Sequence, residues 1–131
     1  MAFDSVRFKK FLKTYGKSEV IFEEGSFGSE MYVLRSGSVR IYRTVDGKKV
    51  DLADMSKTGE FFGEMALVDN APRSASACAL QDDTKLIALD KDKFLFLVSQ
   101  QPTFALVVMH VLCEKIRALS GTVAPVENPA K

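Results

Sequence analysis

The sequence predicts a mainly β fold with flanking helices, an α+β arrangement built around a jelly-roll-like β-roll. Three observations carry this prediction. Glycines divide the middle of the chain into short runs rich in Val, Ile, Tyr and Phe, two of these runs alternate around an Asp-Gly pair, and helical periodicity marks both ends. Regular short strands separated by glycine turns are typical of barrels and jelly rolls. At 131 residues the chain is expected to form one domain, over residues 1–120.

The N-terminal segment has the spacing of a short amphipathic helix. Four apolar residues recur at i, i+3, i+4 and i+7, namely Phe8, Phe11, Leu12 and Tyr15. This spacing places them on one helical face, so a helix is predicted over residues 4–15, ending at Gly16.

The β-roll is predicted over about residues 18–90. Asp46-Gly47 has the composition of a tight hairpin turn between two alternating runs. In the first run Val39 and Ile41 alternate with Arg40 and Tyr42. In the second run Val50 and Leu52 alternate with Asp51 and Ala53. Further strands are predicted over residues 76–80 and 85–89.

Helical periodicity returns after Asp90, which is placed to cap a helix over residues 91–99. Pro102 then opens a longer helix that runs to about Ser120, since proline is favoured in the first helical turn. The last eleven residues, 121–131, contain two prolines and no periodicity, so a disordered tail is expected.

Composition excludes several classes of protein. A net charge of +1 gives no basic surface for nucleic acid, and no apolar run has the length of a membrane span. The two cysteines are isolated among apolar residues, which indicates reduced thiols and a cytoplasmic location. The single histidine, His110, argues against a metal-dependent cupin, and no metal is expected.

One short segment carries most of the functional information. It reads Phe62-Gly63-Glu64-Met65-Ala66-Leu67, and Arg73-Ser74-Ala75 follows six residues later. A glutamate can accept a hydrogen bond from a ribose hydroxyl, and an arginine can bind a phosphate. A short helix opening at Glu64 would direct free backbone N–H groups toward an anion. The segment therefore predicts a site for a ribose fused to a phosphate.

Each of these residues also has a structural explanation. Gly63 could serve only a tight turn, Glu64 could serve only the first turn of a helix, and Arg73 could be a solvated loop residue. Their combination at one spacing, within a glycine-punctuated β context, favours the ligand site.

The same segment resembles the phosphate-binding cassette of the cyclic nucleotide-binding domain family, which includes the bacterial catabolite activator and the regulatory subunits of cyclic-AMP-dependent kinase. The similarity covers roughly residues 18–119 and extends to the strand-like runs around Tyr32-Val33-Leu34 and Gly37-Ser38-Val39. It implies a cyclic nucleotide ligand, cyclic AMP or alternatively cyclic GMP, and no enzymatic activity.

The resemblance also implies residue roles. The phosphate would lie over the turn from Gly63 to Leu67, held by Arg73 and by the backbone N–H groups of Ala66 and Ser74, with Glu64 at the 2'-hydroxyl. The cassette contributes Phe62, Gly63, Glu64, Met65, Ala66, Arg73, Ser74 and Ala75. The wall of the pocket around the sugar and base would comprise Ile41, Leu52 and Ala53. The long C-terminal helix would act as a lid over the base through Leu112, Ile116, Leu119 and Ser120.

Because few residues follow Ser120, the sequence predicts a stand-alone sensor that acts on an effector protein in trans, with no nucleic acid as partner. The alternative from a different class is a β-barrel protein-interaction module that binds no nucleotide. The sequence leaves the oligomeric state open.

Overall fold

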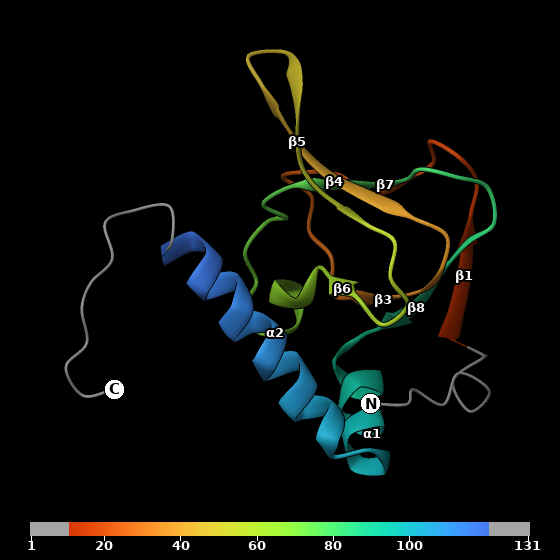
Figure 1. Cartoon of the computed structure of the whole chain (residues 1–131), viewed down its shortest axis with the longest axis vertical. Helices are drawn as coiled ribbons and strands as arrows, with labels where there is room; N and C mark the ends of the chain where they lie inside the picture. Colours follow the sequence, from red (N-terminus) through yellow and green to blue (C-terminus); the bar gives the residue numbers. More distant parts are fainter. Residues whose placement is uncertain (1–10, 121–131) are drawn as a thin grey trace. The chain divides into compact units, whose positions relative to one another are not determined.

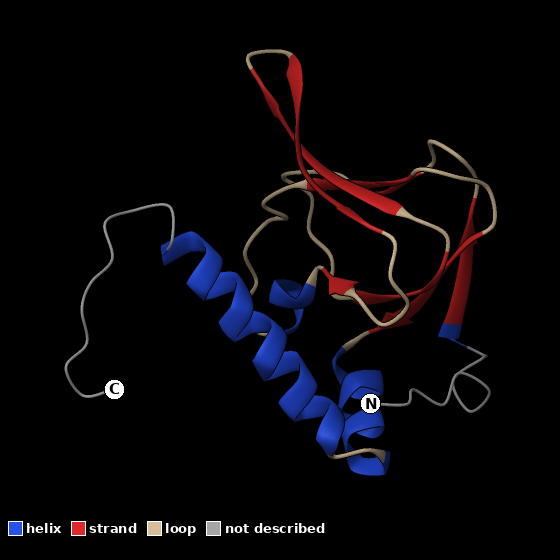
Figure 2. Ribbon diagram, viewed as in Figure 1, coloured by secondary structure: helices blue, strands red, loops and turns tan. Residues whose placement is uncertain are grey.

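The computed structural model describes residues 11–120, whose path is drawn in Figure 1 and whose secondary structure is coloured in Figure 2. The chain forms two compact units that divide after Phe94. The described residues of the first unit contain all the strands, and those of the second are helical.

The described elements are β1 (Leu12–Tyr15), β2 (Val20–Phe22), β3 (Met31–Ser36), β4 (Val39–Val45), β5 (Lys48–Met55), β6 (Phe61–Phe62), the 3-10 helix η2 (Glu64–Leu67), β7 (Ser76–Ala79), β8 (Thr84–Leu89), α1 (Lys91–Gln100) and α2 (Thr103–Ser120).

The strands form two antiparallel four-stranded sheets, ordered β1-β8-β3-β6 and β2-β7-β4-β5 (Figure 1). Strands distant in sequence are neighbours in both sheets, which is the arrangement of a jelly roll. The core between them takes side chains from each sheet, including Leu34 and Leu86 from one and Val39 and Ala77 from the other. The predicted mainly β class is confirmed.

The hairpin between β4 and β5 forms at the predicted turn. Asp46 and Gly47 have φ angles of 53° and 78°, and both are the left-handed values that a two-residue turn of this kind requires. The predicted alternation along β5 is wrong, because Met55 is the one half-buried residue of this strand and the others are exposed. The strand lies at the edge of its sheet and pairs only with β4, so one of its sides has no neighbouring strand.

The predicted N-terminal helix is also wrong where the structure describes it. Residues Leu12–Tyr15 form β1, which pairs with β8 from Leu12 opposite Ile87 to Tyr15 opposite Thr84. The helical spacing of the apolar residues is overridden by backbone pairing with a strand about seventy residues later in the chain. The rest of that prediction, residues 4–10, and the predicted disordered tail lie outside the described residues.

The two helices begin as predicted. The Asp90 carboxylate accepts a hydrogen bond of 2.8 Å from the Lys93 amide, so it caps α1, and α2 begins directly after Pro102. None of the described helices alone has the length and apolarity of a membrane span. The consecutive pair α1 and α2, bent by 116° at the break, reaches those limits only when both are counted together.

Candidate functional site

The predicted cassette begins where β6 ends. Gly63 has φ 75° and ψ 14°, a left-handed conformation that favours glycine, and it turns the chain from β6 into η2. Glu64 lies in the first turn of this 3-10 helix, as predicted. The Ala66 amide donates to the Gly63 backbone oxygen over 3.2 Å, so this amide has an acceptor within the cassette in this structure.

Arg73 lies in the loop between η2 and β7, and its side chain is buried, with 9% exposed. Its Nη2 donates to the Glu30 backbone oxygen over 2.8 Å, and its Nη1 donates to the Gly63 backbone oxygen over 3.3 Å. The guanidinium carbon lies 4.1 Å from the centre of the Phe22 ring, within the range of a cation–π contact. The interpretation of Arg73 as a solvated loop residue is therefore wrong.

The third nitrogen of this guanidinium has no acceptor. Within residues 11–120, the Arg73 Nε is buried and has no hydrogen-bond partner. Nor does any carboxylate of this part of the chain come within 4.0 Å of the Arg73 nitrogens, whereas Arg40 and Arg43 each have a carboxylate partner. A buried cation that contacts only neutral acceptors keeps most of its charge uncompensated.

The surroundings of Arg73 shift two pKa values. Burial lowers the pKa of the Arg73 guanidinium from its ordinary value, and electrostatic interactions with Tyr32 and Glu30 oppose this shift. Burial also raises the pKa of the Tyr32 hydroxyl, helped by Tyr15 and Glu30. Arginine remains charged at neutral pH despite such a shift, so the site presents a desolvated positive charge.

An aromatic cluster lies beneath the guanidinium. The Phe22, Tyr32 and Phe62 rings have centroids 5.5 to 5.9 Å apart. Phe62 and Tyr32 are buried and belong to the core between the sheets. Phe62 is thus a structural support of the cassette, and the other two rings, with Glu30, are site residues that the sequence analysis missed.

The remaining cassette residues differ in exposure. Glu64, Ala66 and Gly63 are half-buried, whereas Met65 and Ser74 are exposed. Ala75 is buried. The exposed Ser74 hydroxyl follows directly on the buried Arg73, so the chain presents a buried cation and an accessible hydroxyl in successive residues.

The predicted pocket wall is only partly assembled. Ile41 packs against the core cluster and pairs with Ala53, whereas Tyr42 pairs with Asp51. Leu52 therefore has no partner on β4 and is the extra residue of a β-bulge. A bulge interrupts the regular alternation of side chains between the two faces of the sheet at Leu52 and Ala53. Leu52 is 53% exposed.

The predicted lid residues all lie on α2, in the second unit. Leu112 is half-buried, and Ser120 is exposed. Ile116 and Leu119 are 62% and 71% exposed, which is high for aliphatic side chains of this size.

A separate depression lies on the outer face of the second sheet. Its volume is about 520 Å³, and its lining residues are Glu23, Glu24, Gly25, Tyr42, Thr44, Lys49 and Ser76. Ser76 alternates with Ala77, which faces the core, so Ser76 points outward. None of the predicted site residues lines this depression.

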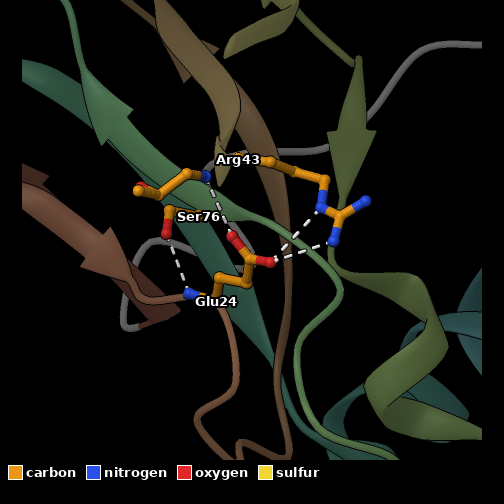
Figure 3. Close-up of polar contacts among 4 residues, drawn as sticks. Glu24, Arg43 and Ser76 are labelled. Atoms are coloured by element: carbon orange, nitrogen blue, oxygen red, sulfur yellow. Dashed lines mark hydrogen bonds and ion pairs between the residues drawn. The ribbon is translucent and has the colours of Figure 1, made fainter. Parts of the chain in front are cut away.

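Glu24 organises this outer face, as Figure 3 shows. Its carboxylate accepts hydrogen bonds from the Thr44 amide over 3.1 Å and from the Arg43 guanidinium over 3.2 Å, and its own amide donates to the Ser76 hydroxyl over 2.8 Å. The Thr44 amide and Arg43 hold the pKa of Glu24 below its ordinary value. These hydrogen bonds tie β7 and β4 to the segment after β2.

Metal ligands are not grouped in the described part of the chain, where no cluster of three or more His, Cys, Asp or Glu side chains could hold an ion.

The chain is similar in sequence and in fold to several known proteins. The chain is 36% identical over 105 residues to the cyclic AMP receptor protein of Thermus thermophilus, a match that covers 80% of this chain and 48% of that protein. The crystal structure of the Thermus thermophilus catabolite activator protein superposes with a TM-score of 0.78 at 35% identity, covering 92% of this chain and 57% of that one. The cAMP-bound form of the EAL enzyme Bd1971 superposes with a TM-score of 0.61 at 37% identity, covering 82% of this chain and 29% of that one.

The chain thus spans about half the length of the Thermus relative. The match does not include the other half of that relative. These relatives therefore give no support to the expectation that the chain has no nucleic-acid partner. Residues 12–101, which include both the cassette and the residues in contact with Arg73, match the family model described as "Cyclic nucleotide-binding domain". This match covers more than half of the chain, and the protein belongs to the cyclic nucleotide-binding domain family.

Proposed function

We propose that the first unit of this chain is a sensor that binds a 3',5'-cyclic nucleotide, with the phosphate at Arg73. The observation that carries the proposal is the buried guanidinium, whose Nε has no acceptor and which has no carboxylate partner among residues 11–120. A phosphate would supply both the missing acceptor and the missing negative charge. The proposal concerns binding and assigns no catalytic step to any residue.

The other cassette residues take the roles that the resemblance implies. Glu64 accepts from the ribose 2'-hydroxyl, and the amides of Ala66 and Ser74 donate to phosphate oxygens, with the Ser74 hydroxyl as a further donor. The Ala66 amide has to exchange its 3.2 Å bond to the Gly63 oxygen for a bond to the ligand. Such an exchange costs little, because one hydrogen bond replaces another.

Phe62, Met65 and Ala75 complete the cassette side of the site, and Ile41, Leu52 and Ala53 form the wall beside the sugar and base. The exposure of Leu52 and Met65 supports this assignment, because both have apolar area for a ligand to cover. Burying such area contributes about 25 cal/mol per Å².

The ligand we favour is cyclic AMP, and cyclic GMP is the alternative. The similarity to the cyclic AMP receptor protein supports cyclic AMP. The EAL enzyme Bd1971 has been solved in a cAMP-bound and in a cGMP-bound form, so likeness to that protein favours neither base.

The output proposed for the sensor is movement of α2 as a lid over the base, passed on to an effector protein in trans. Leu112, Ile116 and Leu119 recur at helical spacing, and Ser120 adds a polar group at the end of the helix. Ligand would favour the covered state and so shift a pre-existing equilibrium. The apolar exposure of Ile116 and Leu119 supports a role in contact with a ligand or a protein.

Calorimetric titration with cyclic AMP, cyclic GMP and 5'-AMP tests the proposal. Heat with a cyclic nucleotide, and much less with 5'-AMP, is the expected result. Silence with all three from a folded protein would contradict the proposal and favour the interaction module that binds no nucleotide. Circular dichroism on the same sample provides the control for folding.

A further inference from the structure

The loop between β2 and β3 approaches Arg73 closely at Gly28. A β-carbon placed on Gly28 would lie 2.5 Å from the Arg73 Nη2, 3.0 Å from its Nε and 3.1 Å from its guanidinium carbon. Non-bonded carbon contacts are ordinarily about 3.5–4.0 Å. Gly28 has no left-handed φ angle, so its backbone conformation is open to any residue. The lack of space beside the Arg73 guanidinium is therefore the reason that position 28 requires a residue without a side chain.

The guanidinium is enclosed from several sides. Phe22 lies against it at 4.1 Å, the Glu30 oxygen holds Nη2, and the Gly63 oxygen holds Nη1. A β-carbon on Gly63 would lie 2.8 Å from Nη1, but Gly63 also has a φ of 75°, which by itself favours glycine. Gly28 is thus the position where the steric effect on Arg73 can be separated from backbone strain.

We propose that Gly28 is a positioning residue for the phosphate site, because its missing side chain lets the Arg73 guanidinium lie against the loop of residues 23–30. In that place Nη1 and Nη2 each donate to a carbonyl oxygen, and the orientation of Nε, the guanidinium nitrogen without an acceptor, is fixed. The assignment of an anion to Nε rests on the proposed function. The placement of the guanidinium by Gly28 can be measured without any ligand.

A side chain at Gly28 would displace the charge without unfolding the protein. The atoms that it meets are the far end of a flexible side chain, so the guanidinium can move by roughly 1 Å to reach an ordinary contact distance. That movement would stretch the bond to the Glu30 oxygen and turn Nε. A misplacement of about 1 Å can cost up to 10²-fold at a catalytic site, and we expect a loss of about tenfold in affinity for cyclic AMP here.

The test compares Gly28→Ala with Gly16→Ala. Gly16 is a matched control, because it also lacks a left-handed φ angle and an added β-carbon would meet its nearest atom at 3.6 Å. The first readout is the Nε–Hε signal of Arg73 in ¹⁵N–¹H spectra of the free protein, identified by its loss in Arg73→Lys. We expect Gly28→Ala to shift this signal and to speed its exchange with water, and Gly16→Ala to leave it unchanged.

The second readout is the affinity for cyclic AMP by calorimetry. We expect Gly28→Ala to bind about ten times more weakly than wild type and Gly16→Ala to bind as wild type does. Gly28→Val, with a larger side chain, should bind more weakly still. An unchanged Nε signal in Gly28→Ala would overturn the proposal, and so would an affinity equal to or higher than that of Gly16→Ala.

The failure of this proposal differs from the failure of the proposed function. If the wild-type protein binds no cyclic nucleotide, the proposed function fails, while the Nε signal of the free protein still decides whether Gly28 positions Arg73. If the wild type binds and Gly28→Ala binds equally well, the positioning role fails alone.

Discussion

Arg73 and Ala66 share one acceptor, the backbone oxygen of Gly63. The Arg73 Nη1 donates to it over 3.3 Å and the Ala66 amide over 3.2 Å. The side chain that carries the charge is thereby tied to the residue that opens the 3-10 helix. A phosphate that takes up either donor changes the hydrogen bonding of the other, so the two halves of the cassette are coupled through a single oxygen.

Replacing Arg73 with Ala is expected to weaken cyclic AMP binding strongly. The phosphate would lose its counter-charge in a desolvated site, and the loss of one partner of such a pair costs about 3–5 kcal/mol. This corresponds to roughly two to three and a half decades in affinity, measured by calorimetry. Arg43→Ala is the matched control, because Arg43 pairs with Glu24 on the outer face. Equal binding by wild type and Arg73→Ala would remove the phosphate role.

Stability gives an independent readout of the same change. The free protein buries the Arg73 charge without a carboxylate partner in the described residues, so truncation removes an unfavourable desolvation together with two hydrogen bonds. We expect the thermal midpoint of Arg73→Ala without ligand to stay near that of the wild type. Saturating cyclic AMP should then raise the midpoint of the wild type alone, because a ligand that binds the native state stabilises it.

Glu64→Gln is expected to weaken cyclic AMP more than 2'-deoxy cyclic AMP. Only the former offers a hydroxyl to the carboxylate, and a hydrogen bond to a charged group is worth about 1.5–3 kcal/mol. Competition titrations with the two ligands on both proteins give the comparison. If the substitution weakens both ligands equally, Glu64 serves the first turn of η2 and not the sugar.

Glu24 is expected to contribute to acid sensitivity. The Thr44 amide and Arg43 hold its pKa below the ordinary value of 4.5 in the folded protein. Its contribution to stability is therefore fully present above about pH 4.5 and is lost as the pH falls through the lower folded pKa. Glu24→Gln should show a shallower loss of stability in this acid range, measured by urea unfolding at several pH values.

Glu23→Gln provides the control, since the Glu23 side chain is not part of the network around Arg43, Thr44 and Ser76 (Figure 3). An identical acid profile for wild type and Glu24→Gln would show that the network does not contribute to the pH dependence.

Local signals in the sequence predicted the local parts of this structure. The left-handed turn at Asp46-Gly47 and the cap at Asp90 each depend on a few adjacent residues, and both form as predicted. β1 could not be found in this way, because its partner β8 is distant in the chain and the local spacing favoured a helix. The exposure of β5 follows from its place at the edge of a sheet, which is a property of the topology.

Some residues of the candidate site could likewise be predicted from the sequence, and others could not. Gly63, Glu64 and Arg73 lie within one short segment, so their spacing pointed to a cassette. The residues that hold Arg73 in place come from another segment, namely Phe22, Gly28 and Glu30. Nothing in their local sequence relates them to an arginine more than forty residues later, and only the fold brings the two segments together.

The last prediction concerns the lid. Ile116→Asp combined with Leu119→Asp places two charges on the exposed apolar positions near the end of α2. If this part of the helix covers the base, the double variant should bind cyclic AMP more weakly and discriminate less between cyclic AMP and cyclic GMP, because charges oppose the burial of an aromatic base. Calorimetry with both nucleotides measures the two effects.

The control for the lid is Arg117→Asp together with Ala118→Asp, which reverses the charge at one of the two intervening exposed positions of the same helix and adds a charge at the other. Since residues 117 and 118 point away from the line through 116 and 119 by helical spacing, a true lid should tolerate this variant better. Both variants are exposed-site changes, so circular dichroism should report wild-type helix content in each. Unchanged affinity and base preference in the folded Ile116→Asp, Leu119→Asp protein would mean that this part of α2 covers no base, and its exposed apolar side chains would then be available to a protein partner.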